Sequence, residues 1–120
     1  QFDANSKEVP LLKEVASAIK KEANKNSTKL AIVILNHPRN RNFEIQDITS
    51  NIIKEFSLDN KVPYLEFSRD YLADNWEEFY TSGTPHFNST GSLAVGTEVY
   101  RWINSKDLKS KIIKDRDEAN

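Results

Sequence analysis

Cysteine is absent from this chain of 120 residues, which also contains only three glycines and two histidines. The lack of cysteine excludes disulfides, thiolate nucleophiles and metal sites with cysteine ligands, and it does not fix the cellular compartment. No apolar run approaches the roughly 20 residues that a bilayer-spanning helix requires. The net charge of −1 gives no overall attraction to nucleic acid or to an anionic membrane. We therefore expect neither a membrane span nor a nucleic-acid partner.

The apolar residues that are present alternate between helix and strand periods along the chain. Steps of three and four residues predict amphipathic helices over Val9 to Ala23 and Phe43 to Phe56. Leu30 to Leu35 is a continuous apolar run, typical of a strand buried on both faces of a parallel sheet. Val62 to Phe67 predicts a second strand, and Ser92 to Asn104 a last helix. This alternation predicts an α/β fold with a parallel sheet.

The length predicts one domain, and the composition divides it into three regions. Residues 1–7 are polar and are expected to be loose. Residues 8–104 carry the α/β pattern. Residues 105–120 are highly charged and are expected to form a loosely packed short helix or a partner contact, with fraying after Lys114. Two strands alone make a narrow sheet with open edges, so we also expect either additional strands from irregular segments or a homodimer that pairs edges.

One short stretch, Ser82 to Gly91, combines a histidine, two glycines and a proline just ahead of the last helix. Catalytic groups are often placed on such loops at the ends of secondary-structure elements, which makes His86 a candidate. Phe87 can anchor the turn in the core. Asn88, Ser89 or Thr90 can cap the helix. The alternative is a helix entry with a solvent-facing histidine.

The run His86-Phe87-Asn88-x-x-Gly91, followed by a helix of small and apolar residues, resembles the C-terminal catalytic block of the SGNH/GDSL hydrolases. In that family the pattern is similar to Asp-x-x-His-x-Asn-x-x-Gly, in which the histidine is the general base for a serine and the aspartate orients it. The resemblance implies a three-layer, flavodoxin-like parallel sheet, of which residues 8–104 would be the C-terminal part. It departs from the family at Gly83, which stands at the position of the aspartate.

The resemblance implies that this chain is the C-terminal part of an ester hydrolase or an O-acyltransferase. His86 is then the catalytic base, with Phe87 and Asn88 at the substrate. The implied partners are a small-molecule or carbohydrate ester and an N-terminal half that supplies the serine; no cofactor is implied. No Gly-Asp-Ser block occurs here, so the chain by itself is expected to be inactive. Loss of the triad carboxylate can itself cost about four orders of magnitude in rate.

The sequence does not determine which group would orient the His86 ring in place of the family's aspartate. Asp74, Glu77 or Glu78 can approach His86 from a different turn, and a backbone carbonyl or a hydroxyl of Ser82 or Thr84 can also hold the ring. These carboxylates also suggest a metal site, but with His86 as the nearby nitrogen ligand and irregular spacing we expect none.

Two functions from other classes remain as alternatives. The first is a non-catalytic α/β interaction module or a degenerate hydrolase remnant. The second is a small flavodoxin-like domain that binds an anion through loops at strand ends, although it lacks the usual glycine-rich phosphate loop. The loop from Asn36 to Asn42 follows the first strand and contains His37, Arg39 and Arg41. It can present cationic side chains to an anionic group, or it is an ordinary exposed loop.

Overall fold

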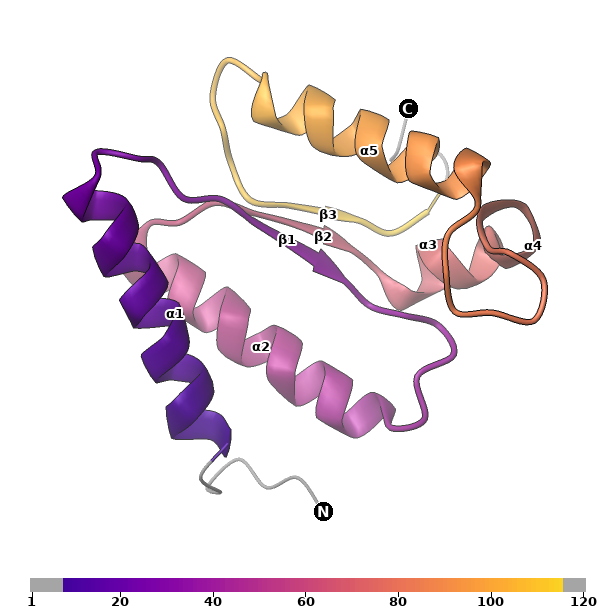
Figure 1. Ribbon diagram of the computed structural model, residues 1–120, viewed down its shortest axis with the longest axis horizontal. Helices are drawn as coiled ribbons and strands as arrows, with labels where there is room; N and C mark the ends of the chain where they lie inside the picture. Colours follow the sequence, from indigo (N-terminus) through magenta and orange to yellow (C-terminus); the bar gives the residue numbers. More distant parts are fainter. Residues whose placement is uncertain (1–7, 116–120) are drawn as a thin grey trace. The chain divides into compact units, whose positions relative to one another are not determined.

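The computed structural model describes residues 8–115, and the expectations for residues 1–7 and for the end of the tail lie outside them. In chain order its elements are α1 (Glu8–Lys25), β1 (Ile32–Leu35), α2 (Phe43–Asn60), β2 (Tyr64–Phe67), α3 (Arg69–Asp74), α4 (Trp76–Phe79), α5 (Ser89–Ile103) and β3 (Lys111–Ile113) (Figure 1). The predicted helices and strands are all present, and α2 is longer than predicted, continuing to Asn60. The expected burial of the first strand on both faces is wrong, because Val33 and Leu35 of β1 are 40% and 47% exposed. None of the helices among residues 8–115 has both the length and the apolar character needed to cross a bilayer.

The chain divides into two compact units. Unit 1 comprises Gln1–Ile32 and Arg41–Tyr64, and unit 2 comprises Val33–Asn40 and Leu65–Asn120. The sheet belongs to unit 2, except that β1 and β2 each begin with one residue of unit 1. No linker-like composition marks this division in the sequence. The chain passes from one unit to the other inside β1, in the loop after β1 and inside β2.

The three strands form a parallel sheet in the order β1-β2-β3, which confirms the predicted α/β class. Leu65 lies opposite Lys111 and Phe67 opposite Ile113 in the register of β2 and β3. At the carboxyl end of β1, the backbone N–H of Asn36 donates to the carbonyl of Phe67 over 3.3 Å. The strands therefore end at a common edge, which is where open α/β sheets place their ligands.

The expected helix in the charged region 105–120 is wrong for its described part, because Lys111–Ile113 is strand β3. Ile113 is 1% exposed, and its carbonyl accepts a hydrogen bond from the backbone N–H of Ser68 over 2.9 Å. A strand of three residues that starts with a lysine and is followed by another is too short to show a period-two pattern in the sequence. Its presence confirms the alternative expectation, an additional strand drawn from an irregular segment.

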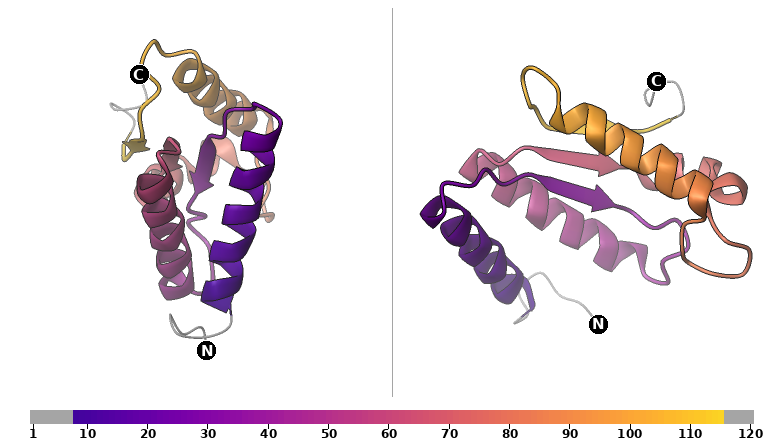
Figure 2. Two further views of the ribbon diagram at one scale, coloured as in Figure 1. Left: turned by 90° about the vertical axis from the view of Figure 1, so that its left-hand side faces the viewer. Right: turned by 45° about the horizontal axis from the view of Figure 1, so that its top comes forward.

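The core of unit 2 lies between α5 and the sheet. Figures 1 and 2 both show α5 running beside β3, and Val95 and Trp102 of α5 pack in the same cluster as Ile113. The indole N–H of Trp102 donates to the carbonyl of Lys109 over 2.7 Å, so this buried polar group is satisfied. Large apolar side chains complete the cluster: Leu65, Phe67, Tyr71, Leu72, Phe79 and Tyr80. Each contributes about 1.5–3 kcal/mol of hydrophobic stabilisation when fully buried.

The segment between β2 and the histidine loop forms two short helices. The hydroxyl of Ser68 caps α3 by accepting from the backbone N–H of Tyr71 over 3.1 Å. Asn75, which is 1% exposed, separates α3 from α4 and donates its side-chain amide to the carbonyl of Tyr71 over 2.8 Å. This turn directs Phe79 and Tyr80 into the core.

In unit 1, α1 packs against α2 around the buried residues Ala16, Phe56 and Val62. The helix predicted at α1 is present, but its apolar face is only partly covered. Val15 and Ile19, which belong to the predicted inner face, are 48% and 51% exposed. The period of apolar residues identifies a helix and its apolar side. Whether that side is buried depends on which other elements pack against it.

Candidate functional site

The His86 loop lies at the carboxyl end of β1. His37 lies two residues beyond the end of β1, and its Nε2 lies 3.2 Å from the carbonyl oxygen of Pro85. Pro85 directly precedes His86 in the chain, so the loop that carries His86 is fastened to the edge at which the parallel strands end. The structure thus brings together the two histidine-containing loops that the sequence placed 48 residues apart.

The imidazole of His86 is exposed, and among residues 8–115 it has no hydrogen-bond, ion-pair or ring partner. The backbone of His86 is fixed by comparison. Its N–H donates to the hydroxyl of Thr84 over 3.3 Å, and its carbonyl accepts from the N–H of Thr81 over 2.9 Å. Thr84 therefore holds the backbone of the loop and not the ring, and neither Ser82 nor any carboxylate of the described residues contacts the ring.

Gly83 has a structural reason to be glycine at the position of the family's aspartate. It adopts φ +75° in a turn closed by a hydrogen bond from the N–H of Thr84 to the carbonyl of Thr81 over 3.0 Å. A positive φ at the third residue of such a turn is the geometry of type II, which favours glycine. A Cβ at Gly83 would meet no atom within 4 Å, so conformation and not space selects the residue.

Asn88 connects the histidine loop to both α4 and α5. Its side-chain oxygen caps α5 by accepting from the N–H of Gly91 over 2.8 Å, which confirms one of the three predicted caps. Its amide nitrogen donates to the carbonyls of Glu78 and Tyr80 over 2.8 and 3.3 Å. Both amide hydrogens are therefore used within the chain. Its assignment to the substrate stays a prediction, while its bracing of the loop is observed.

Phe87 and Gly91 bring the loop close to the core. Phe87 is half-buried against the core cluster and pairs with Tyr80 in an isolated antiparallel bridge, which confirms it as the anchor of the turn. A Cβ on Gly91 would collide with the carbonyl oxygen of Phe79 and lie 2.8 Å from Cδ1 of Phe87. Glycine is needed here because the first turn of α5 contacts the backbone of the last residue of α4 directly.

An aromatic cluster that the sequence pattern does not predict lies beside the two loops. Trp76 stacks on Tyr80 with 4.3 Å between ring centroids, and Tyr80 lies 4.8 Å from Phe87. The His37 ring meets Trp76 and Tyr80 edge-on, at 5.7 and 5.3 Å. Edge-to-face contacts at these separations are favourable for aromatic rings. The sequence places several aromatic residues between Trp76 and Tyr80, which is compatible with a cluster. It does not indicate that the loop after β1 contacts them.

The hydrogen bonds of His37 determine which of its nitrogens carries the proton. The backbone N–H of Arg39 donates to Nδ1 over 3.1 Å, so Nδ1 must be unprotonated. A carbonyl can only accept, so Nε2 carries the hydrogen that points to Pro85. His37 is therefore a neutral imidazole with both nitrogens engaged, in contrast to His86.

Tyr80 is buried to 6% exposure, and burial raises the pKa of its phenol from 10.0 to about 12. No hydrogen-bond partner for its hydroxyl is found in the described part of the chain. Desolvation without a compensating donor disfavours the phenolate, which explains the direction of the shift. Tyr80 is thus an uncharged support for the loops and is not suited to accept a proton near neutral pH.

A buried polar pair joins β1 and β2 where they end. Asn36 and Glu66 are each 6% exposed, and the Asn36 amide donates to Oε2 of Glu66 over 2.8 Å and to the Phe67 carbonyl over 3.2 Å. A hydrogen-bonded carboxylate is tolerated in a core, whereas an unpaired one is very costly. The sequence indicated this buried pair by placing a glutamate, Glu66, within the largely apolar run that predicts the second strand.

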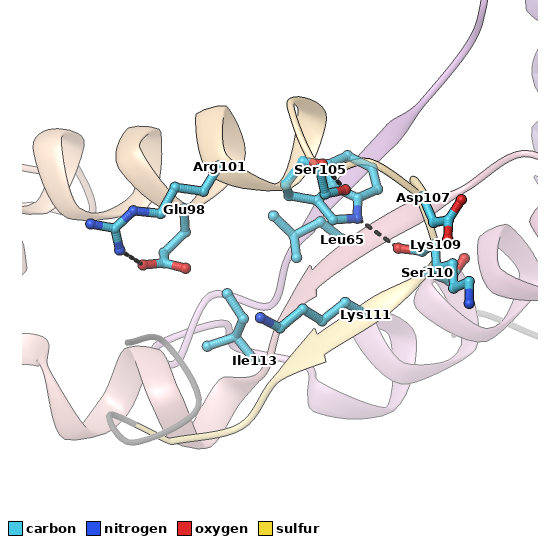
Figure 3. A pocket seen from close by; sticks show the side chains of 10 residues that line it. Leu65, Glu98, Arg101, Ser105, Asp107, Lys109, Ser110, Lys111 and Ile113 are labelled. Carbon is cyan, nitrogen blue, oxygen red and sulfur yellow. Dashed lines mark hydrogen bonds and ion pairs between the residues drawn. The ribbon is translucent and has the colours of Figure 1, made fainter.

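Two further features bear on the chemistry of unit 2. Residues 8–115 bring together no group of three histidine, aspartate or glutamate side chains that could hold a metal ion. A cavity of about 500 Å³ lies between α5 and β3 and is lined by residues that include Trp102 and Ile113. Figure 3 shows Arg101 and Glu98 on α5 across from Lys111 and Ile113. The rim of the cavity carries the ion pair of Arg101 and Glu98, whose atoms are 3.2 Å apart. This cavity contains no histidine and none of the residues of the His86 loop, so we do not place the candidate site there.

Comparison with protein-family models, with curated proteins and with solved structures found no match to this chain.

Proposed function

We propose that this chain is the C-terminal part of an SGNH-like ester hydrolase or O-acyltransferase, in which His86 is the base for a serine supplied by another part of the protein. The other part would complete a three-layer, flavodoxin-like sheet. The observation that supports this best is the contrast between the two histidines. Both ring nitrogens of His37 form hydrogen bonds within the chain. The His86 ring is exposed and has no partner among the described residues, although hydrogen bonds hold the backbone of its loop in place.

In the proposed reaction, an imidazole nitrogen of His86 takes the proton from the serine hydroxyl as the serine oxygen forms a bond to the ester carbonyl carbon. The tetrahedral intermediate collapses with cleavage of the bond to the alkoxy oxygen, which takes the proton back from the imidazolium. Water or an acceptor hydroxyl then repeats the steps on the acyl-serine. The hydrogen bonds of Asn88 and the contacts of Phe87 hold the loop that positions His86.

A non-catalytic interaction module is the second candidate, because no carboxylate of the described residues orients the His86 ring. Without such a carboxylate, the tautomer of the histidine is not fixed and the imidazolium that forms during the reaction is less stabilised. In this second function, His86 would be a surface residue at an element end, and its replacement would leave any activity of a longer protein unchanged.

The test is to join this chain to a nucleophile half of the SGNH type and to measure hydrolysis of a short-chain ester by the joined protein. Replacing His86 by Ala or Gln should reduce kcat by about 10²–10⁴-fold, the usual contribution of a general base. Thr90→Ala, an exposed change next to the loop, is the matched control and should retain the activity. Equal activity with and without His86 would overturn the proposal and favour the interaction module.

A further inference from the structure

Arg39 presents an oriented cation beside the two histidine loops. Its guanidinium carbon lies 4.6 Å from the centroid of the Trp76 ring. The side chain is exposed, and no carboxylate of residues 8–115 pairs with it, although α3 and α4 contain Asp74, Glu77 and Glu78. Arg101 of the same unit differs from Arg39 in this respect, because it forms an ion pair with Glu98.

Both the backbone and the side chain of Arg39 are held. Its N–H donates to Nδ1 of His37, whose opposite nitrogen donates to the Pro85 carbonyl next to His86. The Trp76 ring under the guanidinium is itself stacked on buried Tyr80. The cation is thus linked through one imidazole to the backbone of the His86 loop, and it rests on a ring that the core keeps in place.

A contact over an aromatic ring uses the face of the guanidinium and leaves the N–H groups at its edges available. These donors form a fork that matches two oxygens of a carboxylate or a phosphate group. Because stacking restricts the side chain before any ligand arrives, less freedom is lost when the two hydrogen bonds form. A lysine at this position would supply the charge without the fork or the planar stack.

We propose that Arg39 binds an anionic group, a carboxylate or a phosphate, of the molecule that this site recognises. As a statement about the substrate, this inference rests on the proposed function and narrows it to esters that carry a negative charge away from the scissile bond. As a statement about binding, it needs no catalysis by His86.

The binding test uses this chain, labelled with ¹⁵N, and titrates acetate or inorganic phosphate at constant pH and ionic strength. Saturable shifts are expected for the Arg39 Nε–H and the Trp76 indole N–H, with the Trp102 indole as an internal reference. Arg39→Ala should abolish saturation, and Arg39→Lys should weaken binding by about tenfold or more. Arg41→Ala removes the same charge two residues away and should bind as the unaltered chain does. Equal titrations for the unaltered chain and Arg39→Ala would overturn the inference.

The two anions separate the two kinds of ligand. Tighter saturation by acetate assigns the site to carboxylates, and tighter saturation by phosphate assigns it to phosphate groups. A shift of Trp76 that sodium chloride, titrated separately, produces equally well would be general screening, and it would also contradict the inference.

A second experiment separates this inference from the proposed function. In the joined protein, monomethyl succinate and methyl butyrate differ by a carboxylate in place of a methyl group. Arg39→Lys should raise KM for the charged ester alone and leave kcat unchanged, which is the signature of lost ground-state binding. If both esters respond alike, the anionic substrate is wrong while His86 can still be the base. If anions bind but His86→Ala has no effect on hydrolysis, the proposed function is wrong and the anion site stands.

Discussion

The Nε2 atom of His37 donates a hydrogen bond to the carbonyl oxygen of Pro85 over 3.2 Å and so joins the loop after β1 to the loop before α5. The same ring accepts from the N–H of Arg39 over 3.1 Å. One histidine therefore fixes two loops at the edge where the strands end. The other histidine, one residue beyond Pro85, is left with its ring in solvent.

The first prediction concerns the tautomer of His37. At neutral pH, long-range ¹H–¹⁵N spectra should show a hydrogen on Nε2 and an unprotonated Nδ1, because the two hydrogen bonds permit no other neutral form. His37→Phe keeps a ring against Trp76 and Tyr80 but removes both hydrogen bonds. It should accelerate amide exchange at Thr81, whose N–H is bonded to the His86 carbonyl. An Nδ1–H tautomer of His37 would contradict the geometry.

The second prediction compares two asparagines that cap helices. Asn88→Ala should lower the free energy of unfolding by about 2–3 kcal/mol, because it removes the cap of α5 and two further hydrogen bonds to the backbone. Asn42→Ala, which removes the cap of α2, should cost about 1 kcal/mol. Denaturant unfolding of the two variants measures the difference. Similar losses would mean that Asn88 is an ordinary cap and does not brace the loop.

The third prediction uses two glycines of the same helix. Gly91→Ala should destabilise the protein by about 1–3 kcal/mol, since the new methyl group collides with the Phe79 carbonyl and crowds Phe87. Gly96→Ala should stabilise it by about 0.5–1 kcal/mol, because nothing lies within 4 Å and alanine favours a helix. Thermal unfolding of both variants should therefore move in opposite directions. A neutral Gly91→Ala would show that α5 does not approach α4 so closely.

The fourth prediction follows from burial of the Tyr80 phenol. Its pKa rises from 10.0 to about 12 on folding, so above pH 10 the unfolded chain loses this proton first and stability falls as pH rises. The loss should reach about 1.4 kcal/mol at about pH 11. Tyr80→Phe removes this contribution and keeps the ring contacts. Its free energy of unfolding should match the unaltered chain near pH 8 within about 1 kcal/mol and decline less steeply toward pH 11. Equal slopes for both would contradict a buried, unionised phenol.

The α/β class, the three long helices and two of the three strands follow from patterns in the sequence, namely the regular apolar period of the helices and the continuous apolar run Leu30 to Leu35. The short helices α3 and α4 carry no such pattern. Strand β3 does not follow from it. Lys111-Ile112-Ile113 is too short to show a period, and it becomes a strand because β2 offers it a partner and α5 covers Ile113. Tertiary context of this kind is not contained in a local window.

The same division holds for the candidate site. His86, Phe87, Asn88 and Gly91 could be selected from the sequence because a turn, an anchor and a cap have local signatures. The hydrogen bond of His37 to Pro85 and the stack of Trp76 on Tyr80 could not, because they depend on which loops meet at the strand ends. The prediction that Asp74, Glu77 or Glu78 contacts the His86 ring is wrong for the same reason, because position along the chain does not determine which side chains meet in space.

The difference between the two imidazoles can be measured directly on this chain, which has two histidines in all. Diethyl pyrocarbonate reacts with an accessible, unprotonated imidazole nitrogen, and peptide mass spectrometry separates the two sites. We expect His86 to be modified many times faster than His37, whose nitrogens are both engaged. Equal rates, or faster modification of His37, would contradict the claim that His86 is the imidazole available to take a proton from another molecule.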